Sequence, residues 1–112
     1  MIIVRDRISL EELKEMAQEG FLDFVKAVAD IEQGIMAIGG EMHADCEKIL
    51  LEQGSQQQNL WGFNIFPDKP RGQMLEYTSL INIRPRQGNR TMQIQSDEVR
   101  NKILEIVNKL VI

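Results

Sequence analysis

One short segment holds the only histidine and the only cysteine of the chain, set among acidic residues. It reads EMHADCE over residues 41–47, and polar side chains alternate with apolar ones. On a strand, Glu41, His43 and Asp45 project from one face, about 6.5–7 Å between successive members. Histidine and carboxylates bind zinc and similar divalent ions, and three protein ligands plus water form a catalytic site. A strand here therefore predicts a metal site of Glu41, His43 and Asp45, with Glu47 as a general base.

This metal hypothesis depends on the segment being a strand. On a helix, Glu41 and Asp45 would share a face, but His43 would point away from them. A simpler interpretation of the alternation is a row of polar side chains on a half-exposed strand. Cys46 would lie on the opposite face of that strand from His43, which argues against a thiolate pair. A single cysteine on an apolar face is typical of a small buried hydrophobic residue.

A second group of residues is suited to binding an anion. Residues 84–90 read RPRQGNR, with three arginines around a glycine turn. Guanidinium groups bind phosphate and carboxylate groups in a bidentate way. We therefore expect Arg84, Arg86, Asn89 and Arg90 to bind an anionic ligand or a protein partner. The alternative is a solvated loop whose arginines pair with the surplus acids of the chain.

Helices are predicted near both ends of the chain. Ser9 and Glu12 form a capping box for a helix that ends near Gly20. Ser96 caps a second helix, and acidic residues follow it in the first turn. The apolar residues of this second helix recur at helical spacing: Val99, Ile103, Ile106, Val107 and Leu110. This wide apolar stripe must pack against the rest of the domain.

Between the helices, the pattern favours strands. Residues 24–31 alternate with strand period, and residues 32–34 read EQG, which predicts a hairpin loop with Gly34 in the left-handed conformation. A second strand starts at Ile35. One long helix over residues 21–38 is the alternative, although Gly34 would cost it about 1 kcal/mol.

We expect the second strand to continue through residue 47, with a turn near 45–48 and another strand through 49–51. A helical alternative places Met42, Cys46, Ile49, Leu50 and Gln53 on one face and ends at Gly54. Further strands are expected over residues 60–66 and 74–84, each ended by proline. The sum is an α+β fold: an antiparallel meander of about five short strands, with an N-terminal and a C-terminal helix packed on it.

Size and charge restrict the class of protein. The 112 residues fit a single domain, residues 1–112, and the formal net charge is −4. An acidic chain is a poor match for nucleic acid or an anionic membrane, and no apolar run approaches the roughly 20 residues of a membrane span. A lone cysteine allows no internal disulfide, so the expected location is cytoplasmic. A homodimer through the apolar C-terminal helix or a sheet edge would cover exposed apolar surface.

Several phrases of the sequence resemble a known family. They are DIEQGIMAIGG, MHADCE, LLEQGS, NLWGFN, LINIRPRQGNR and DEVRNKILEIVNKLV. Together they are similar to a family of small, uncharacterised prokaryotic proteins that is classed as a domain of unknown function. MHADCE and INIRPRQGNR are the most specific parts. The resemblance implies a standalone cytoplasmic domain, and it implies no catalytic residue.

Two functional hypotheses follow from these patterns. The first is a non-enzymatic binding or regulatory module that uses the Arg84–Arg90 loop for an anionic ligand or a protein partner. The second is a small metal-assisted hydrolase that uses Glu41, His43 and Asp45 with a divalent ion. In that case Glu47 would act as the base, and the arginines would stabilise negative charge in the transition state.

Overall fold

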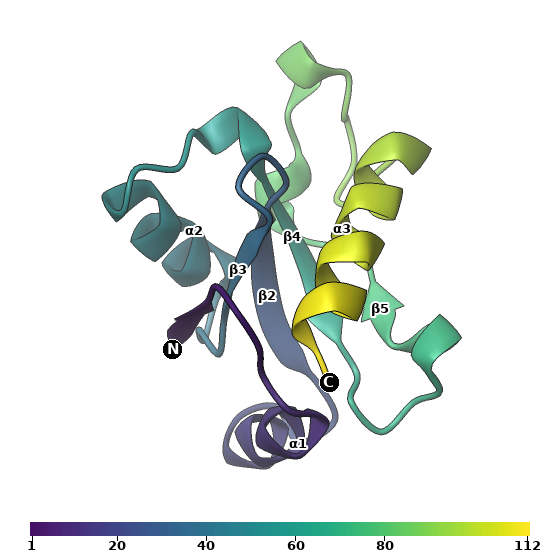
Figure 1. The fold of residues 1–112 in the computed structure, drawn as a ribbon. Helices are drawn as coiled ribbons and strands as arrows, with labels where there is room; N and C mark the ends of the chain where they lie inside the picture. Colours follow the sequence, from purple (N-terminus) through teal and green to yellow (C-terminus); the bar gives the residue numbers. More distant parts are fainter.

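A computed structural model describes all 112 residues and shows three α-helices and a five-stranded antiparallel sheet (Figure 1). The strands are β1 (Ile2–Val4), β2 (Val25–Asp30), β3 (Ile35–Ile38), β4 (Leu60–Ile65) and β5 (Leu75–Glu76). The helices are α1 (Leu10–Glu19), α2 (His43–Glu52) and α3 (Asp97–Leu110). None of the helices is both long and apolar enough to cross a membrane. The predicted α+β class is confirmed.

The strand order is β1-β3-β2-β4-β5, and every neighbouring pair is antiparallel. Because β3 and β4 both pair with β2, they run parallel to each other with β2 between them. The chain therefore leaves β3, passes through α2 and returns as β4, as in a split β-α-β unit. This crossover corrects the expected meander, in which each strand would pair with the next along the chain.

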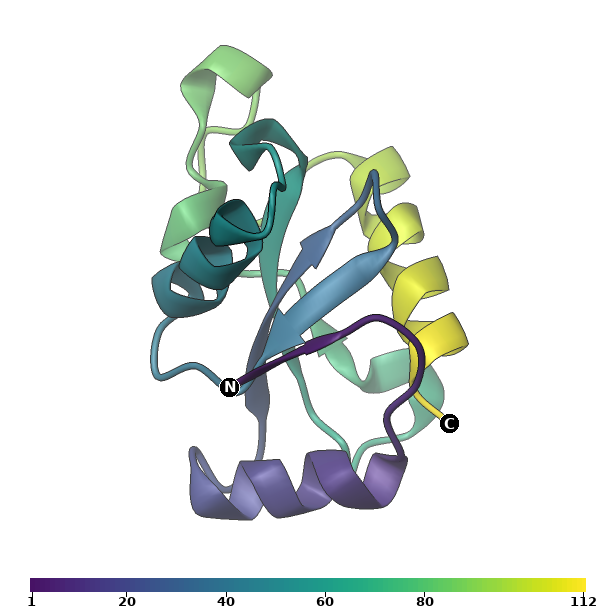
Figure 2. The ribbon, with the colours of Figure 1, turned by 60° about the vertical axis from the view of Figure 1, so that its left-hand side comes forward.

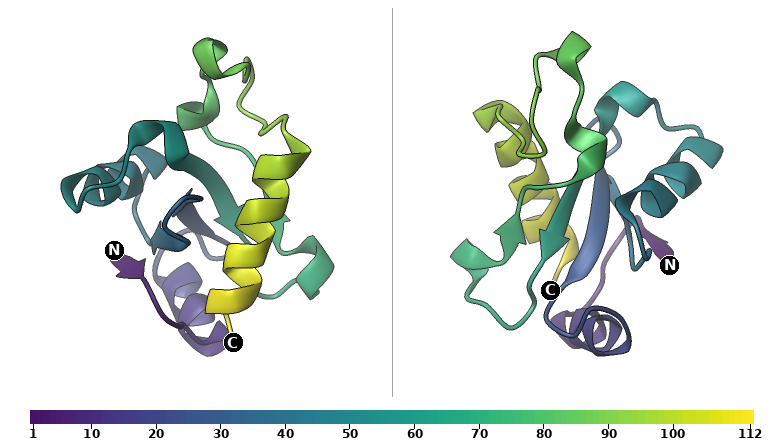
Figure 3. Two further views of the ribbon diagram at one scale, coloured as in Figure 1. Left: turned by 45° about the horizontal axis from the view of Figure 1, so that its top comes forward. Right: turned by 180° about the vertical axis from the view of Figure 1, so that it is seen from behind.

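Helices cover both faces of the sheet. Figure 2 shows α2 and α3 on opposite sides of the sheet, with α1 across one end, and the right-hand view of Figure 3 shows the same arrangement from behind. The larger core lies between the sheet and the α1 and α3 helices, and includes Leu13, Phe63 and Ile103. The smaller core lies under α2 and includes Cys46 and Leu50. Burial on both faces explains why nearly every residue of β2, β3 and β4 is buried.

Both terminal helices form where their caps predict them. The Ser9 hydroxyl accepts a hydrogen bond from the Glu12 amide at 3.1 Å, and α1 ends at Gly20. The Ser96 hydroxyl accepts one from the Val99 amide at 3.2 Å. Each cap satisfies an amide that has no partner within its helix.

The predicted hairpin is also confirmed, and the long-helix alternative over residues 21–38 is wrong. Asp30 pairs with Ile35, so the loop has the four residues 31–34 instead of three. Gly34 adopts a φ of 71°, the left-handed conformation expected of it. The buried Asp30 carboxylate shapes the loop, because its Oδ1 accepts hydrogen bonds from the amides of Glu32 and Gln33.

The expected strand over residues 41–47 is wrong. The strand β3 ends at Ile38, Gly39 turns the chain with a φ of 88°, and α2 begins at His43. Helical spacing places Cys46, Ile49 and Leu50 against the same small core, whereas a two-residue alternation would turn Ile49 to the opposite face. The Asp45 carboxylate accepts a hydrogen bond from the Met42 amide at 3.1 Å, so an acid predicted as a metal ligand starts the helix.

The expected strand over residues 74–84 is reduced to β5, which has two residues. The chain then leaves the sheet because the Ser79 hydroxyl accepts a hydrogen bond from the Ile81 amide and caps a 3₁₀ turn over Leu80–Asn82. The side chain of Asn82 replaces a strand at this point. Its amide accepts a hydrogen bond from the Gly62 nitrogen at 2.8 Å and donates one to the Gly62 oxygen at 2.9 Å. An amide side chain thus occupies the place of a peptide group beside β4.

Candidate functional site

The histidine of the predicted metal site points toward the sheet. His43 is the first residue of α2, and its Nε2 lies 2.9 Å from both the Phe63 carbonyl oxygen and Asn64 Oδ1. The Asn64 amide nitrogen donates to Glu76, so its oxygen faces the histidine as an acceptor. Both partners are acceptors, and Nε2 must therefore carry the hydrogen. Burial lowers the pKa of His43 below its ordinary value of 6.5, although these two hydrogen bonds oppose the shift.

The predicted metal ligands do not converge. His43 binds the β4 backbone, Asp45 caps α2, and the exposed Glu41 precedes the helix. No three histidine, cysteine, aspartate or glutamate side chains lie close enough together to hold a metal ion. The segment therefore supplies helix caps and packing, and its donor groups lack the geometry that the hydrolase hypothesis requires.

Cys46 lies on the buried face of α2 and is fully buried. Burial raises the pKa of its thiol, because a thiolate would lose its hydration there. A buried cysteine with a raised pKa is a poor nucleophile. The expectation that Cys46 is a small core residue agrees with this placement.

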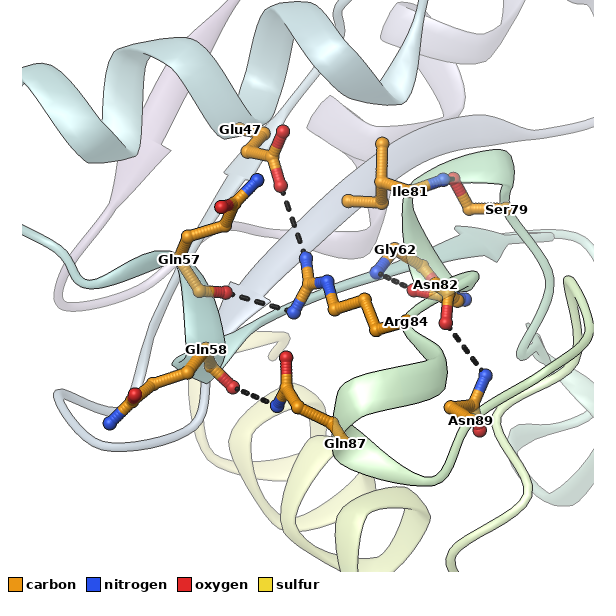
Figure 4. A network of polar contacts seen from close by, with 10 residues as sticks. All are labelled: Glu47, Gln57, Gln58, Gly62, Ser79, Ile81, Asn82, Arg84, Gln87 and Asn89. Carbon is orange, nitrogen blue, oxygen red and sulfur yellow. Dashed lines mark hydrogen bonds and ion pairs between the residues drawn. The ribbon is translucent and has the colours of Figure 1, made fainter.

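Glu47, predicted as a general base, pairs instead with Arg84. The two side chains form a salt bridge at 3.1 Å, and their side-chain exposures are only 14% and 11%. Figure 4 shows the Arg84 guanidinium between Glu47 and the Gln57 carbonyl oxygen, to which it donates at 2.8 Å. Its Cζ also lies 5.1 Å from the ring centroid of Trp61. Arg84 thus links α2, the 3₁₀ turn before β4 and the loop that follows β5.

Burial lowers the pKa of Arg84 from its ordinary value, while the charge of Glu47 opposes that shift. A guanidinium remains protonated at neutral pH in either case. The Glu47 carboxylate therefore neutralises one of the three arginines that the sequence offered for anion binding.

Asn89 also has a role inside the loop. It is buried, and its Nδ2 lies within 2.9 Å of the backbone oxygens of Asn82, Thr91 and Gln93. Its Oδ1 accepts a hydrogen bond from the Gln95 amide at 2.8 Å. These contacts use the donors and acceptors of the side chain, so Asn89 holds the loop in shape.

The remaining two arginines face solvent. Arg86 and Arg90 are exposed, and neither forms a salt bridge. Of the four predicted binding residues, the structure therefore places two inside the fold and two on its surface. Ligand binding by Arg86 and Arg90 stays a prediction.

Arg86 and Arg90 belong to a longer stretch that we call the basic segment, residues 77–96. It contains three arginines and no acidic residue, in a chain whose net charge is −4. The segment also carries three exposed apolar side chains: Leu80 (71% exposed), Ile83 (43%) and Met92 (42%). Figure 1 shows the middle of this segment, in green, as a loop that projects from one end of the molecule. Exposed apolar side chains beside unpaired arginines are typical of protein-binding surfaces.

The largest hollow lies at the other end of the molecule. It has a volume of about 660 Å³ and lies between the end of α1 and the turn from β3 to α2. Phe21, Phe24 and Met42 are among its apolar lining residues. Its charged groups are the carboxylates of Glu19 and Glu41, the ammonium of Lys26 and the amino group of Met1. We call it the α1 hollow.

Lys26 is already engaged within the α1 hollow. Its ammonium lies 4.6 Å from the ring centroid of Phe21 and donates a hydrogen bond to the Glu41 carbonyl oxygen at 3.0 Å. The side chains of Glu19 and Glu41 form no salt bridge. Beside them, Leu22 has a φ of 70° and a side chain that is 59% exposed. A left-handed leucine is strained by roughly 1–2 kcal/mol, and this one gains little from burial in return.

Comparison with known proteins gives the family of the chain. Residues 2–110 match the model of a protein family, which is described as a protein of unknown function (DUF5674). The chain belongs to this family. The resemblance inferred from the sequence phrases is therefore confirmed, and the family description assigns no activity. No curated protein and no solved structure matches the chain.

Three features of these surfaces were not predicted from the sequence. The absence of acids from residues 77–96 can be read from the sequence, and it indicates the basic segment. The Glu47–Arg84 pair joins residues far apart in the chain, and no local pattern indicates it. The α1 hollow likewise combines residues from α1, β2 and the turn before α2.

Proposed function

We propose that this chain is a non-enzymatic binding module whose basic segment, residues 77–96, binds an acidic segment of a protein. The observation that carries the proposal is the combination of Arg86 and Arg90 with exposed Leu80, Ile83 and Met92 on one acid-free loop. Arginine is enriched at interfaces, and apolar contacts beside it supply affinity. The charge of the loop is opposite to that of the chain as a whole, which favours acidic partners.

A protein segment suits this loop better than a small anion. Arg84, the arginine nearest the body of the domain, is paired with Glu47. The hollow of about 250 Å³ beside the loop is lined by Trp61, Gln87 and Gln95 among others, but by none of the arginines. Arg86 and Arg90 therefore act from an open surface, where a small anion would be bound weakly and an extended partner would contact apolar side chains too.

The alternative of a metal-assisted hydrolase has no comparable support. Its proposed ligands Glu41, His43 and Asp45 have separate partners, and Glu47 pairs with Arg84. A catalytic metal needs three converging ligands, and the side chains provide no such group.

Fluorescence anisotropy with a labelled peptide of alternating glutamate and leucine tests the proposal. We expect salt-sensitive binding that weakens about tenfold when Arg86→Glu and Arg90→Glu are combined, since each exposed ion pair contributes up to about 1 kcal/mol. Arg7→Glu with Lys48→Glu is the matched control, because both residues are exposed and lie outside the basic segment. An equal loss in the control would show that only net charge matters, and the proposal would fail.

A further inference from the structure

Charge is divided between the two ends of the molecule. Residues 11–23, which form most of α1 and the loop after it, contain five acids and one lysine. The basic segment, residues 77–96, contains three arginines and no acid. Figure 1 shows α1 at one end and the projecting loop of the basic segment at the other, and the longest dimension of the molecule is 37 Å. The chain therefore has an acidic end and a basic end.

Both ends also expose apolar side chains. At the acidic end, Phe21 (41% exposed), Leu22 (59%) and Met42 (57%) lie in or beside the α1 hollow. Leu22 is held there in a left-handed conformation, with its amide donating to the Ala17 carbonyl oxygen at 2.6 Å. A strained residue that presents an exposed aliphatic side chain is an outlier that points to a function for this surface. Apolar surface at both ends favours contact between them.

Both ends keep charged groups that form no salt bridge. After the Glu47–Arg84 pair is formed, Arg86 and Arg90 remain at the basic end without a salt bridge. At the α1 hollow, Glu19 and Glu41 are the carboxylates without a salt bridge. The ammonium of Lys26 contacts Phe21 and the Glu41 carbonyl oxygen, and the amino group of Met1 is a second cation. The excess negative charge at this end comes from residues 11–23, so Arg86 and Arg90 would meet an acidic surface around the hollow.

We propose that the α1 hollow of one molecule binds the basic segment of a second copy of this chain. This inference rests on the proposed function and names its acidic partner. The contact joins two different surfaces, so it is heterologous and propagates head to tail. Because the surfaces lie at opposite ends, one molecule can use both at once without the two neighbours colliding.

Sedimentation velocity over a range of protein concentrations tests the proposal. At about 0.01 M ionic strength, where the Debye length is about 30 Å, the average mass should rise with concentration. At about 1 M, where it is about 3 Å, the mass should fall toward that of a monomer. A wild-type chain that stays monomeric at low ionic strength up to millimolar concentration would overturn the proposal.

Charge-reversed variants identify the two surfaces. Arg86→Glu with Arg90→Glu, and separately Glu19→Lys with Glu41→Lys, should each weaken self-association about tenfold or more. An equal mixture of the two variants should associate again, because each reversed surface then meets a matching one. Association that survives either variant, or a mixture that stays monomeric, contradicts the proposal. Circular dichroism of each variant confirms that it is folded.

The peptide experiment separates this inference from the function on which it rests. If the acidic peptide binds the basic segment while the wild-type chain stays monomeric, the binding module stands and self-association fails. If the peptide does not bind and the chain is monomeric, both fail. If self-association is observed, the acidic peptide should inhibit it in competition, and an absence of inhibition would place the contact elsewhere.

Discussion

Arg84 shows how one side chain can be removed from a binding surface by its neighbours. Its guanidinium contacts a carboxylate, a backbone carbonyl and an indole ring, each from a different part of the chain. Such a group contributes to the fold because three segments depend on its position. The same contacts leave it few donors for a ligand.

Removing one member of the Glu47–Arg84 pair leaves the other nearly buried without an opposite charge. We expect Arg84→Met or Glu47→Leu alone to lower the free energy of unfolding by about 2–3 kcal/mol. The double substitution should cost less than the sum of the two, because it leaves no unpaired charge. Urea unfolding of the four proteins measures this coupling, and strictly additive losses would argue against the pair.

The single histidine makes the pH dependence of stability simple to assign. Burial depresses the pKa of His43 in the folded state, so the unfolded state binds more protons as the pH falls below the ordinary value of 6.5. Stability should therefore fall as the pH is lowered from about 7.5 through 6.5, until the folded-state pKa is reached. Urea midpoints at a series of pH values measure the slope. His43→Gln should flatten it in this window, and an unchanged slope would assign the effect to other groups.

Among the elements, α2 shows what the sequence could and could not predict. Polar and apolar residues alternate over residues 41–47, which include the first turn of α2. That pattern fits a strand as well as the start of a helix. Packing decides between the two, because Cys46, Ile49 and Leu50 can contact the same small core only on a helix. The terminal helices were predictable because α1 has a capping box and a terminal glycine, and α3 has both a cap and a wide apolar stripe.

The predicted strand over residues 74–84 is mostly wrong for a different reason. Its alternation is real, but Ser79 and Asn82 satisfy backbone groups with their side chains and free the chain from the sheet. The partner of Asn82 is 20 residues away in the sequence, and the partners of Arg84 are also distant. The arginine loop was visible in the sequence, whereas the division of its residues between the interior and the surface depended on tertiary contacts.

The contact of β4 with the 3₁₀ turn after β5 gives a prediction for an element boundary. A Cβ atom at Gly62 would lie 2.6 Å from the Ser79 Cβ, so Gly62→Ala must displace that turn. We expect a loss of about 1–3 kcal/mol in the free energy of unfolding. Gly72→Ala is the control, because a Cβ there meets nothing within 4 Å. Thermal and urea unfolding should show the loss for Gly62→Ala and little change for Gly72→Ala.

At the scale of the whole molecule, the sheet separates two cores of unequal size. The core under α2 has 6 buried residues, and the core on the other face has 19. Elements that bury less apolar surface open at a lower free energy. We therefore expect α2 to detach from the sheet before the domain unfolds as a whole.

Cys46 reports this opening because it is the only thiol and is fully buried. The free energy of opening obtained from the rate of thiol labelling should be lower than the free energy of global unfolding from urea. A Leu50→Ala variant should lower this free energy of opening further, since it weakens the same small core. If the free energy of opening equals the free energy of global unfolding in the wild type, then α2 and the larger core unfold together.

The amide of Asn82 has a consequence for the evolution of the surface. A strand beside β4 would have to keep its alternation over many residues, and any insertion would shift its register. Here one side chain forms both hydrogen bonds to Gly62, and the exposed residues 85–88 do not have to keep a strand register. The sheet edge is closed against pairing with other chains at this point. The exposed tip of the projecting loop, residues 85–88, can therefore change in length and sequence, while Arg84 and Asn89 on either side hold the loop in place.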